Sequence, residues 1–77
     1  MSDDTTSRVV EIVTSVLQVK EKDPAKLTRA NLPEWDSLSQ IEILFSVEEE
    51  FDTAFDPDGL GELDSVAALV AALTAPS

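Results

Sequence analysis

Residues 37–51 (SLSQIEILFSVEEEF) constrain the fold more than any other segment of this chain. The segment contains no Gly or Pro, and its apolar residues recur at spacings of three and four, which is the period of an α-helix. One helical face collects Ile43, Leu44, Val47 and Phe51. Asp36 precedes the segment and is a good N-cap residue. The sequence therefore predicts a helix over 37–51 with one face on a hydrophobic core.

Residues 5–19 predict a second long helix. Its apolar side chains at helical spacing are Val9, Ile12, Val13, Val16 and Leu17. The candidates for its N-cap are Asp4, Thr5 and Thr6. The high β-branched content also allows a strand over 9–13, but the helical period continues to Val19 and favours one helix.

Residues 20–36 predict a long loop. Pro24 and Pro33 interrupt the segment, and Leu27 and Leu32 are spaced as anchors that attach it to the core. A loop of this length is usually functional or disordered.

The C-terminal part predicts one short helix and one longer helix. Asp56 followed by Pro57 is a cap with proline at the first helical position, so we expect a short helix over 57–62. Gly59 and Gly61 each cost about 1 kcal/mol in a helix interior, which makes that helix marginal.

The last helix is expected over 65–74, with Asp64 as its cap and Pro76 at its end. Its apolar stripe consists of Val66, Leu69, Val70 and Leu73. We therefore predict a single all-α domain over residues 1–77: a four-helix bundle of three main helices, one short helix and a long first loop.

Length and composition argue against autonomous catalysis. A chain of 77 residues buries roughly 60% of its unfolded surface, which provides one small core and little room for a walled cleft. The absence of His and Cys excludes Ser-His-Asp and Cys-His sites, disulfides and thiolate metal sites. Paired carboxylates are expected by chance in so acidic a chain.

An acidic cluster at 56–64 is spaced somewhat like the calcium ligands of an EF-hand. The match fails because Leu60 occupies the third ligand position and Gly59 comes too early. We expect no catalytic residues and no specific metal site.

The net charge of −11 is unevenly distributed. All five basic residues lie in 1–29, whereas 30–77 contain eleven acidic residues and no basic one. Such a field repels nucleic acid and anionic membranes and attracts basic partners, although a merely solvated acidic surface explains the charge equally well.

No apolar run approaches the ~20 residues of a membrane span, and the first residues are unlike a signal or transit peptide. We expect a cytoplasmic monomer.

A second apolar stripe on the helix over 37–51 consists of Leu38, Ile41 and Phe45. The carboxylates that flank it are Glu42, Glu48 and Glu49. Apolar anchors with a charged rim suit the groove of a partner protein. The alternative is that the long loop buries this stripe as well, so that the helix is covered on both sides.

Ser37 lies at the edge of this stripe, directly before Leu38. A serine in this position is most often a capping or surface residue. Because Asp36 can serve as N-cap, the Ser37 hydroxyl is expected at the first helical position, free and pointing outward. A phosphate on that oxygen would lie at a helix N-terminus, which favours anions.

Residues 36–38 (DSL) and the helix that follows them resemble the acyl carrier proteins. The stretch 48–53 (EEEFDT) is especially similar to the fatty-acid type, and the order of the other segments agrees over nearly the whole chain. The resemblance implies a four-helix bundle with a short third helix. It also implies a carrier that is not itself an enzyme. In the family, a phosphopantetheinyl transferase with Mg²⁺ attaches 4′-phosphopantetheine from coenzyme A to a serine, and the arm holds acyl groups as thioesters. The resemblance implies that Ser37 is the matching serine.

The resemblance also implies a recognition face for the transferase and for acyl-loading and acyl-processing enzymes with basic docking patches. The matching positions are Asp36, Leu38, Ile41, Glu42, Phe45, Glu48 and Glu49. In the family, a tethered chain can slip between the second and third helices. The weak segment at Gly59 and Gly61 would give the local looseness that this needs, although poor helix propensity alone explains the segment equally well.

One departure from the fatty-acid pattern narrows the expected role. Pro33, Glu34 and Trp35 precede Asp36, where housekeeping members usually have Leu-Gly-x. A W-D-S-L start is more similar to stand-alone carriers of specialised pathways, with fatty-acid synthesis second and an aminoacyl or peptidyl carrier third. From another class, the chain could be an acidic helical binding module that is never modified. Trp35 itself is expected to anchor the loop on the bundle.

Overall fold

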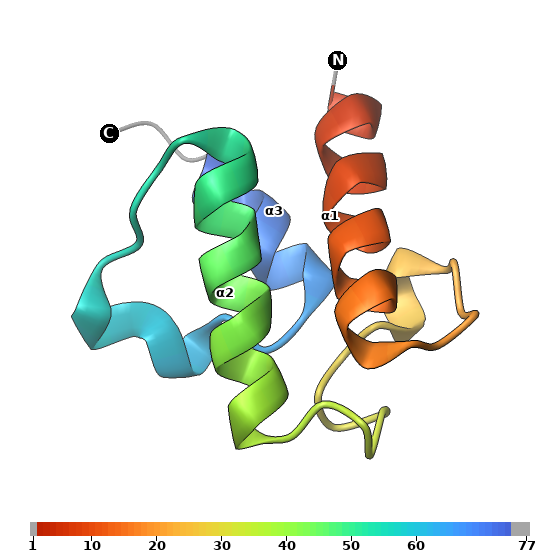
Figure 1. The fold of residues 1–77 in the computed structure, drawn as a ribbon. Coiled ribbons are helices and arrows are strands. Elements are labelled where there is room, and N and C mark those ends of the chain that lie inside the picture. Colours follow the sequence, from red (N-terminus) through yellow and green to blue (C-terminus); the bar gives the residue numbers. More distant parts are fainter. Residues whose placement is uncertain (1, 75–77) are drawn as a thin grey trace.

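The computed structural model describes residues 2–74, which form a helical bundle (Figure 1). Its three α-helices are α1 (Ser2–Leu17), α2 (Ser37–Phe51) and α3 (Val66–Thr74). Two short 3₁₀-helices, η1 (Pro24–Lys26) and η2 (Pro57–Glu62), lie in the connections. Helix α1 contacts both α2 and α3. Within residues 2–74 there is no strand beyond one isolated bridge, so the all-α prediction is confirmed.

The core is built by one face of each α-helix and by two residues of the long loop. Its buried apolar members are Val9, Val13, Leu17, Leu27, Trp35, Ile43, Leu44, Val47, Val66 and Leu69. The predicted core face of α2 is confirmed, with Phe51 partly buried at its end. Val70 and Leu73 of α3 are also only partly buried.

Helix α1 is shifted towards the N-terminus relative to the prediction of 5–19. Its proposed N-caps Asp4, Thr5 and Thr6 lie inside the helix, because no Gly or Pro interrupts the chain from Ser2 onward. The helix ends at Leu17, since Gln18 adopts a left-handed backbone (φ 57°) and the Val19 N–H donates to the Thr14 carbonyl over 3.1 Å. This is the Schellman arrangement.

Helix α2 agrees with the predicted bounds and ends in the same way. Asp52 adopts φ 51°, and the Thr53 N–H donates to the Glu48 carbonyl over 3.0 Å. Both helices are thus terminated by a left-handed residue that is not glycine.

The long loop is attached to the start of α3 by backbone hydrogen bonds. The Arg29 N–H donates to the Asp64 carbonyl (2.8 Å), and the Val66 N–H donates to the carbonyl of the buried Leu27 (3.0 Å). Thr28 and Ser65 form the isolated bridge between these contacts. Leu27 is therefore the anchor predicted from its spacing.

The prediction that Asp64 caps the last helix is wrong. The Ser65 hydroxyl accepts the Ala68 N–H (3.0 Å), and α3 begins at Val66. Asp64 instead belongs to the pairing with the loop, because its carbonyl accepts from Arg29. Pro76 lies outside the described residues.

The short helix over 57–62 is confirmed, as a 3₁₀-helix. Asp56 caps it by accepting the Asp58 N–H over 3.0 Å, and Pro57 occupies the first position. Gly59 and Gly61 have ordinary negative φ angles.

Candidate functional site at the start of helix α2

Ser37 is the first residue of α2, and its side chain is exposed. Asp36 before it has an extended backbone, and its Oδ1 accepts the Ser39 N–H over 2.9 Å. The predicted N-cap is therefore confirmed. Because Asp36 satisfies this N–H, capping does not use the Ser37 hydroxyl.

The cap holds the pKa of Asp36 below its ordinary value of 3.8, chiefly because the Ser39 backbone N–H stabilises the carboxylate, and secondly because the Ser39 side chain does so. A carboxyl with a lowered pKa stabilises the fold fully above its ordinary pKa. That contribution is lost as the pH falls through the lower, folded-state pKa.

This cap predicts a specific pH dependence of stability. We expect the wild type to lose more stability between pH ~5 and pH ~2 than the Asp36→Asn variant, whose amide oxygen still accepts the Ser39 N–H but does not titrate. Urea midpoints followed by circular dichroism across this range measure the difference. All other carboxylates are common to both proteins, so parallel curves would contradict the prediction.

Arg29 contacts Ser37 from the long loop. Its Nη2 donates to the Ser37 Oγ over 3.2 Å. The hydroxyl is exposed as predicted, but the expectation that it is free is wrong, because it accepts this hydrogen bond. The contact could not be predicted from the sequence, since residue 29 lies in a loop with no periodic pattern.

Trp35 fixes the chain just before Ser37. Its indole is only 2% exposed, and Nε1–H donates to Oε1 of the buried Gln40. The Gln40 amide in turn donates to the carbonyls of Leu60 (3.2 Å) and Leu63 (2.7 Å). Trp35 thus anchors the loop as predicted, and Gln40 connects it to η2.

Gln40 is a residue that the sequence reasoning missed. A signal was present, because Gln40 lies three, four and seven residues before Ile43, Leu44 and Val47 on the same helical face. A polar residue on a core stripe must find hydrogen-bond partners within the protein.

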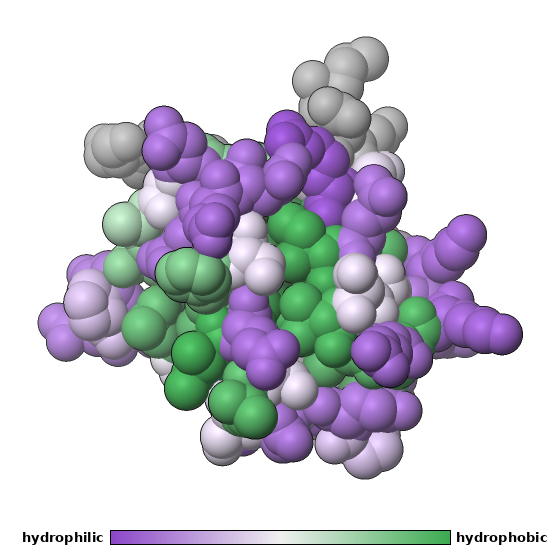
Figure 2. Space-filling view, viewed as in Figure 1, coloured by the Kyte–Doolittle hydropathy of each residue, from purple (hydrophilic) through white to green (hydrophobic). Residues whose placement is uncertain are grey.

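The second stripe of α2 is exposed to solvent. Leu38, Ile41 and Phe45 are 66%, 64% and 62% exposed. Figure 2 shows apolar surface over α2 with polar side chains around it. The alternative in which the long loop buries this stripe is therefore wrong.

The three carboxylates expected beside the stripe have different surroundings. Glu42 and Glu49 are exposed. Glu48 is half-buried, and its Oε2 accepts the Phe55 N–H over 2.7 Å. Glu48 therefore holds the connection between α2 and η2 in place, whatever else it contacts.

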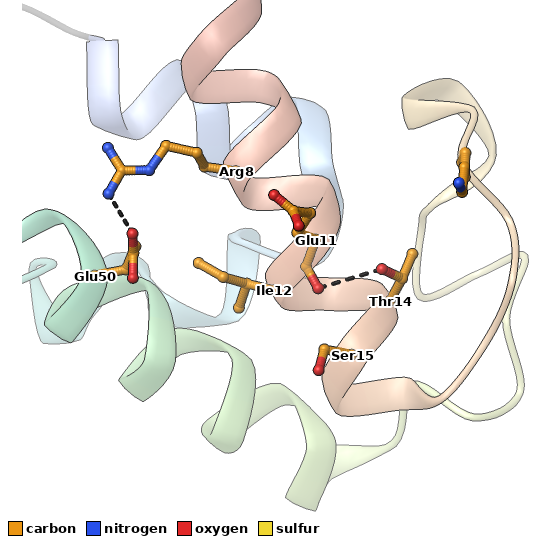
Figure 3. Close-up of a pocket in the computed structure, with 7 residues that line it drawn as sticks. Arg8, Glu11, Ile12, Thr14, Ser15 and Glu50 are labelled. Atoms are coloured by element: carbon orange, nitrogen blue, oxygen red, sulfur yellow. Dashed lines mark hydrogen bonds and ion pairs between the residues drawn. The ribbon is translucent and has the colours of Figure 1, made fainter.

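An open groove of about 590 Å³ lies elsewhere, between α1 and the end of α2 (Figure 3). Arg8 and Glu50 form an ion pair across it, and the Arg8 guanidinium lies 4.7 Å from the centre of the Phe51 ring. None of its lining residues belongs to the start of α2. The groove is thus separate from Ser37.

The described residues contain no group of three or more His, Cys, Asp or Glu side chains placed to hold a metal ion. No helix in the same part of the chain is long and apolar enough to cross a membrane.

Chemically, the start of α2 offers an exposed hydroxyl with a neighbouring guanidinium. Such a hydroxyl has room for a covalent phosphate ester, and the guanidinium supplies a cation for it.

Comparisons with protein-family models, with curated proteins and with solved structures each found no match to this chain.

Proposed function

We propose that this chain is an acyl carrier protein that carries 4′-phosphopantetheine on Ser37 and serves a dedicated biosynthetic pathway. The observation that supports this most strongly is the exposed Ser37 hydroxyl at the first position of a capped helix, directly beside an exposed apolar stripe. The order of helices adds support. The resemblance implies a long loop before the second helix and a short helix before the last one, and both are present.

The group suits this site because the Ser37 side chain is exposed and the neighbouring Arg29 guanidinium can pair with a negative charge there. In the modification, a bond forms between the Ser37 Oγ and the phosphorus that bears the pantetheine of coenzyme A. The pyrophosphate P–O bond breaks, and 3′,5′-ADP leaves with its bonding electron pair. The serine proton passes to a base of the transferase, since Asp36 is engaged as a cap and the chain has no His. When bound, the arm supplies a thiol that holds an acyl group as a thioester.

The chain's own contribution is delivery. A tethered group is presented to each partner enzyme at a high effective concentration, without any chemistry by the carrier. We assign docking to the stripe Leu38, Ile41 and Phe45, with Glu42 and Glu49 meeting basic patches on the transferase and on acyl-processing enzymes. The approach through Pro33, Glu34 and Trp35 favours a dedicated pathway over the general fatty-acid pool.

Intact-mass measurement tests the proposal. After incubation with coenzyme A, Mg²⁺ and a phosphopantetheinyl transferase, we expect the wild type to gain the mass of one phosphopantetheinyl group. Ser37→Ala should gain nothing, whereas Ser46→Ala, at another serine of the same helix, should be modified like the wild type.

Failure of the wild type to gain mass with several transferases would overturn the proposal. The exposed stripe and the acidic surface would then favour the second candidate, an unmodified helical module that binds a basic partner.

A further inference from the structure

Arg29 is the basic residue that contacts Ser37. Its guanidinium donates to the Ser37 Oγ over 3.2 Å, and no basic residue occurs anywhere in 30–77. The other charged residues near the hydroxyl along the chain are acidic, because Asp36 directly precedes Ser37 and Glu34 lies three residues before it. A new negative charge on Ser37 would therefore be repelled by the carboxylates that precede it in the chain. It would be attracted by one guanidinium, that of Arg29 in the long loop.

The fold brings Arg29 to this position. Its N–H donates to the Asp64 carbonyl over 2.8 Å, and the neighbouring Thr28 is bridged to Ser65. Leu27, two residues earlier, is fully buried. The backbone of Arg29 is thus fixed on the start of α3, whereas its side chain is exposed and can turn from the hydroxyl towards a group attached to it.

We propose that Arg29 forms an ion pair with the phosphodiester on Ser37 and so restrains the base of the attached arm. This inference rests on the proposed function. A guanidinium can donate two parallel N–H bonds to two oxygens of a phosphate. A neutral serine hydroxyl offers only one oxygen and no charge. The existing hydrogen bond already places the guanidinium beside the oxygen to which the phosphate would be attached.

A thermodynamic cycle separates this pairing from a purely structural role of Arg29. Wild type and Arg29→Gln are each prepared unmodified and fully modified, with the extent of modification verified by intact mass. If Arg29 contacted only the serine oxygen, its replacement would cost no more in the modified form than in the unmodified form. Pairing with the phosphate should make Arg29→Gln cost roughly 1–5 °C more in the modified form. The excess should shrink in ~1 M salt.

Two further variants sharpen the cycle. Lys26→Gln removes the same charge from the same loop at an exposed position with no contact to Ser37, and it should show no excess cost. Arg29→Lys keeps the charge without the planar fork and should retain part of the effect. As a direct readout, the ³¹P resonance of the modified protein should shift in Arg29→Gln but not in Lys26→Gln.

The outcomes distinguish the two proposals. If the wild type gains mass but Arg29→Gln and Lys26→Gln behave alike in melting and in ³¹P shift, the Arg29 pairing is overturned and the carrier function stands. If the wild type gains no mass at all, the carrier function itself is overturned, and the pairing falls with it.

Discussion

Replacing Trp35 with Ala is expected to lower the free energy of unfolding by about 3–5 kcal/mol, out of the 5–15 kcal/mol typical of a small domain. The indole is 2% exposed within the core, so its removal leaves a cavity. The substitution also leaves the Gln40 Oε1 without the donor it has in the wild type. Urea unfolding followed by circular dichroism measures the loss.

Trp35→Phe is the matched control, because it retains most of the apolar volume and removes the Nε1–H. We expect it to cost about 1–3 kcal/mol, the range for leaving one buried polar group unsatisfied. The difference between the two variants then reports the packing contribution of the part of the ring that Phe retains. Two variants within ~0.5 kcal/mol of the wild type would show that Trp35 does not anchor the loop.

The second large effect concerns docking rather than stability. Phe45→Ser is expected to lower kcat/KM for modification by the transferase at least ~10-fold, because burying such a side chain in an interface is worth about 1.5–3 kcal/mol. Since Phe45 is 62% exposed, the unfolding midpoint should change little. Initial rates by intact mass, together with a melting curve, test both statements. An unchanged rate would remove the stripe from the recognition face.

Charge reversal tests the rim of the same surface. Glu42→Lys should slow modification several-fold at low salt, whereas Glu11→Lys, an equal change on α1, should leave the rate unchanged. Glu48 is unsuitable for this comparison, because its carboxylate holds the Phe55 N–H and its loss would disturb the loop as well as the surface charge. Equal effects of the two reversals would indicate a response to net charge alone.

Local signals were enough to predict some elements. The bounds of α2 agree with the prediction because Asp36 caps its start and no Gly or Pro interrupts it before Phe51. The cap and proline at Asp56 and Pro57 likewise predicted η2. These features depend on neighbours within a few residues along the chain.

Other features depend on contacts between distant segments and carry no local signal. The cap of α3 is Ser65 rather than the predicted Asp64, because the long loop pairs with the segment before the helix. Helix α1 ends at a left-handed Gln18, where a sequence pattern would have needed glycine. The contact of Arg29 with Ser37 joins a loop to a helix start, so no spacing along the chain could predict it.

The position of Gln40 links two segments that are far apart in sequence. One side-chain amide both accepts from Trp35, ahead of Ser37, and donates to the carbonyls of Leu60 and Leu63. If η2 moves away from α2, it must give up both donated bonds and bring water to the Gln40 amide. That water then competes for the indole N–H. We therefore expect opening of the short helix to loosen the chain before Ser37 as well.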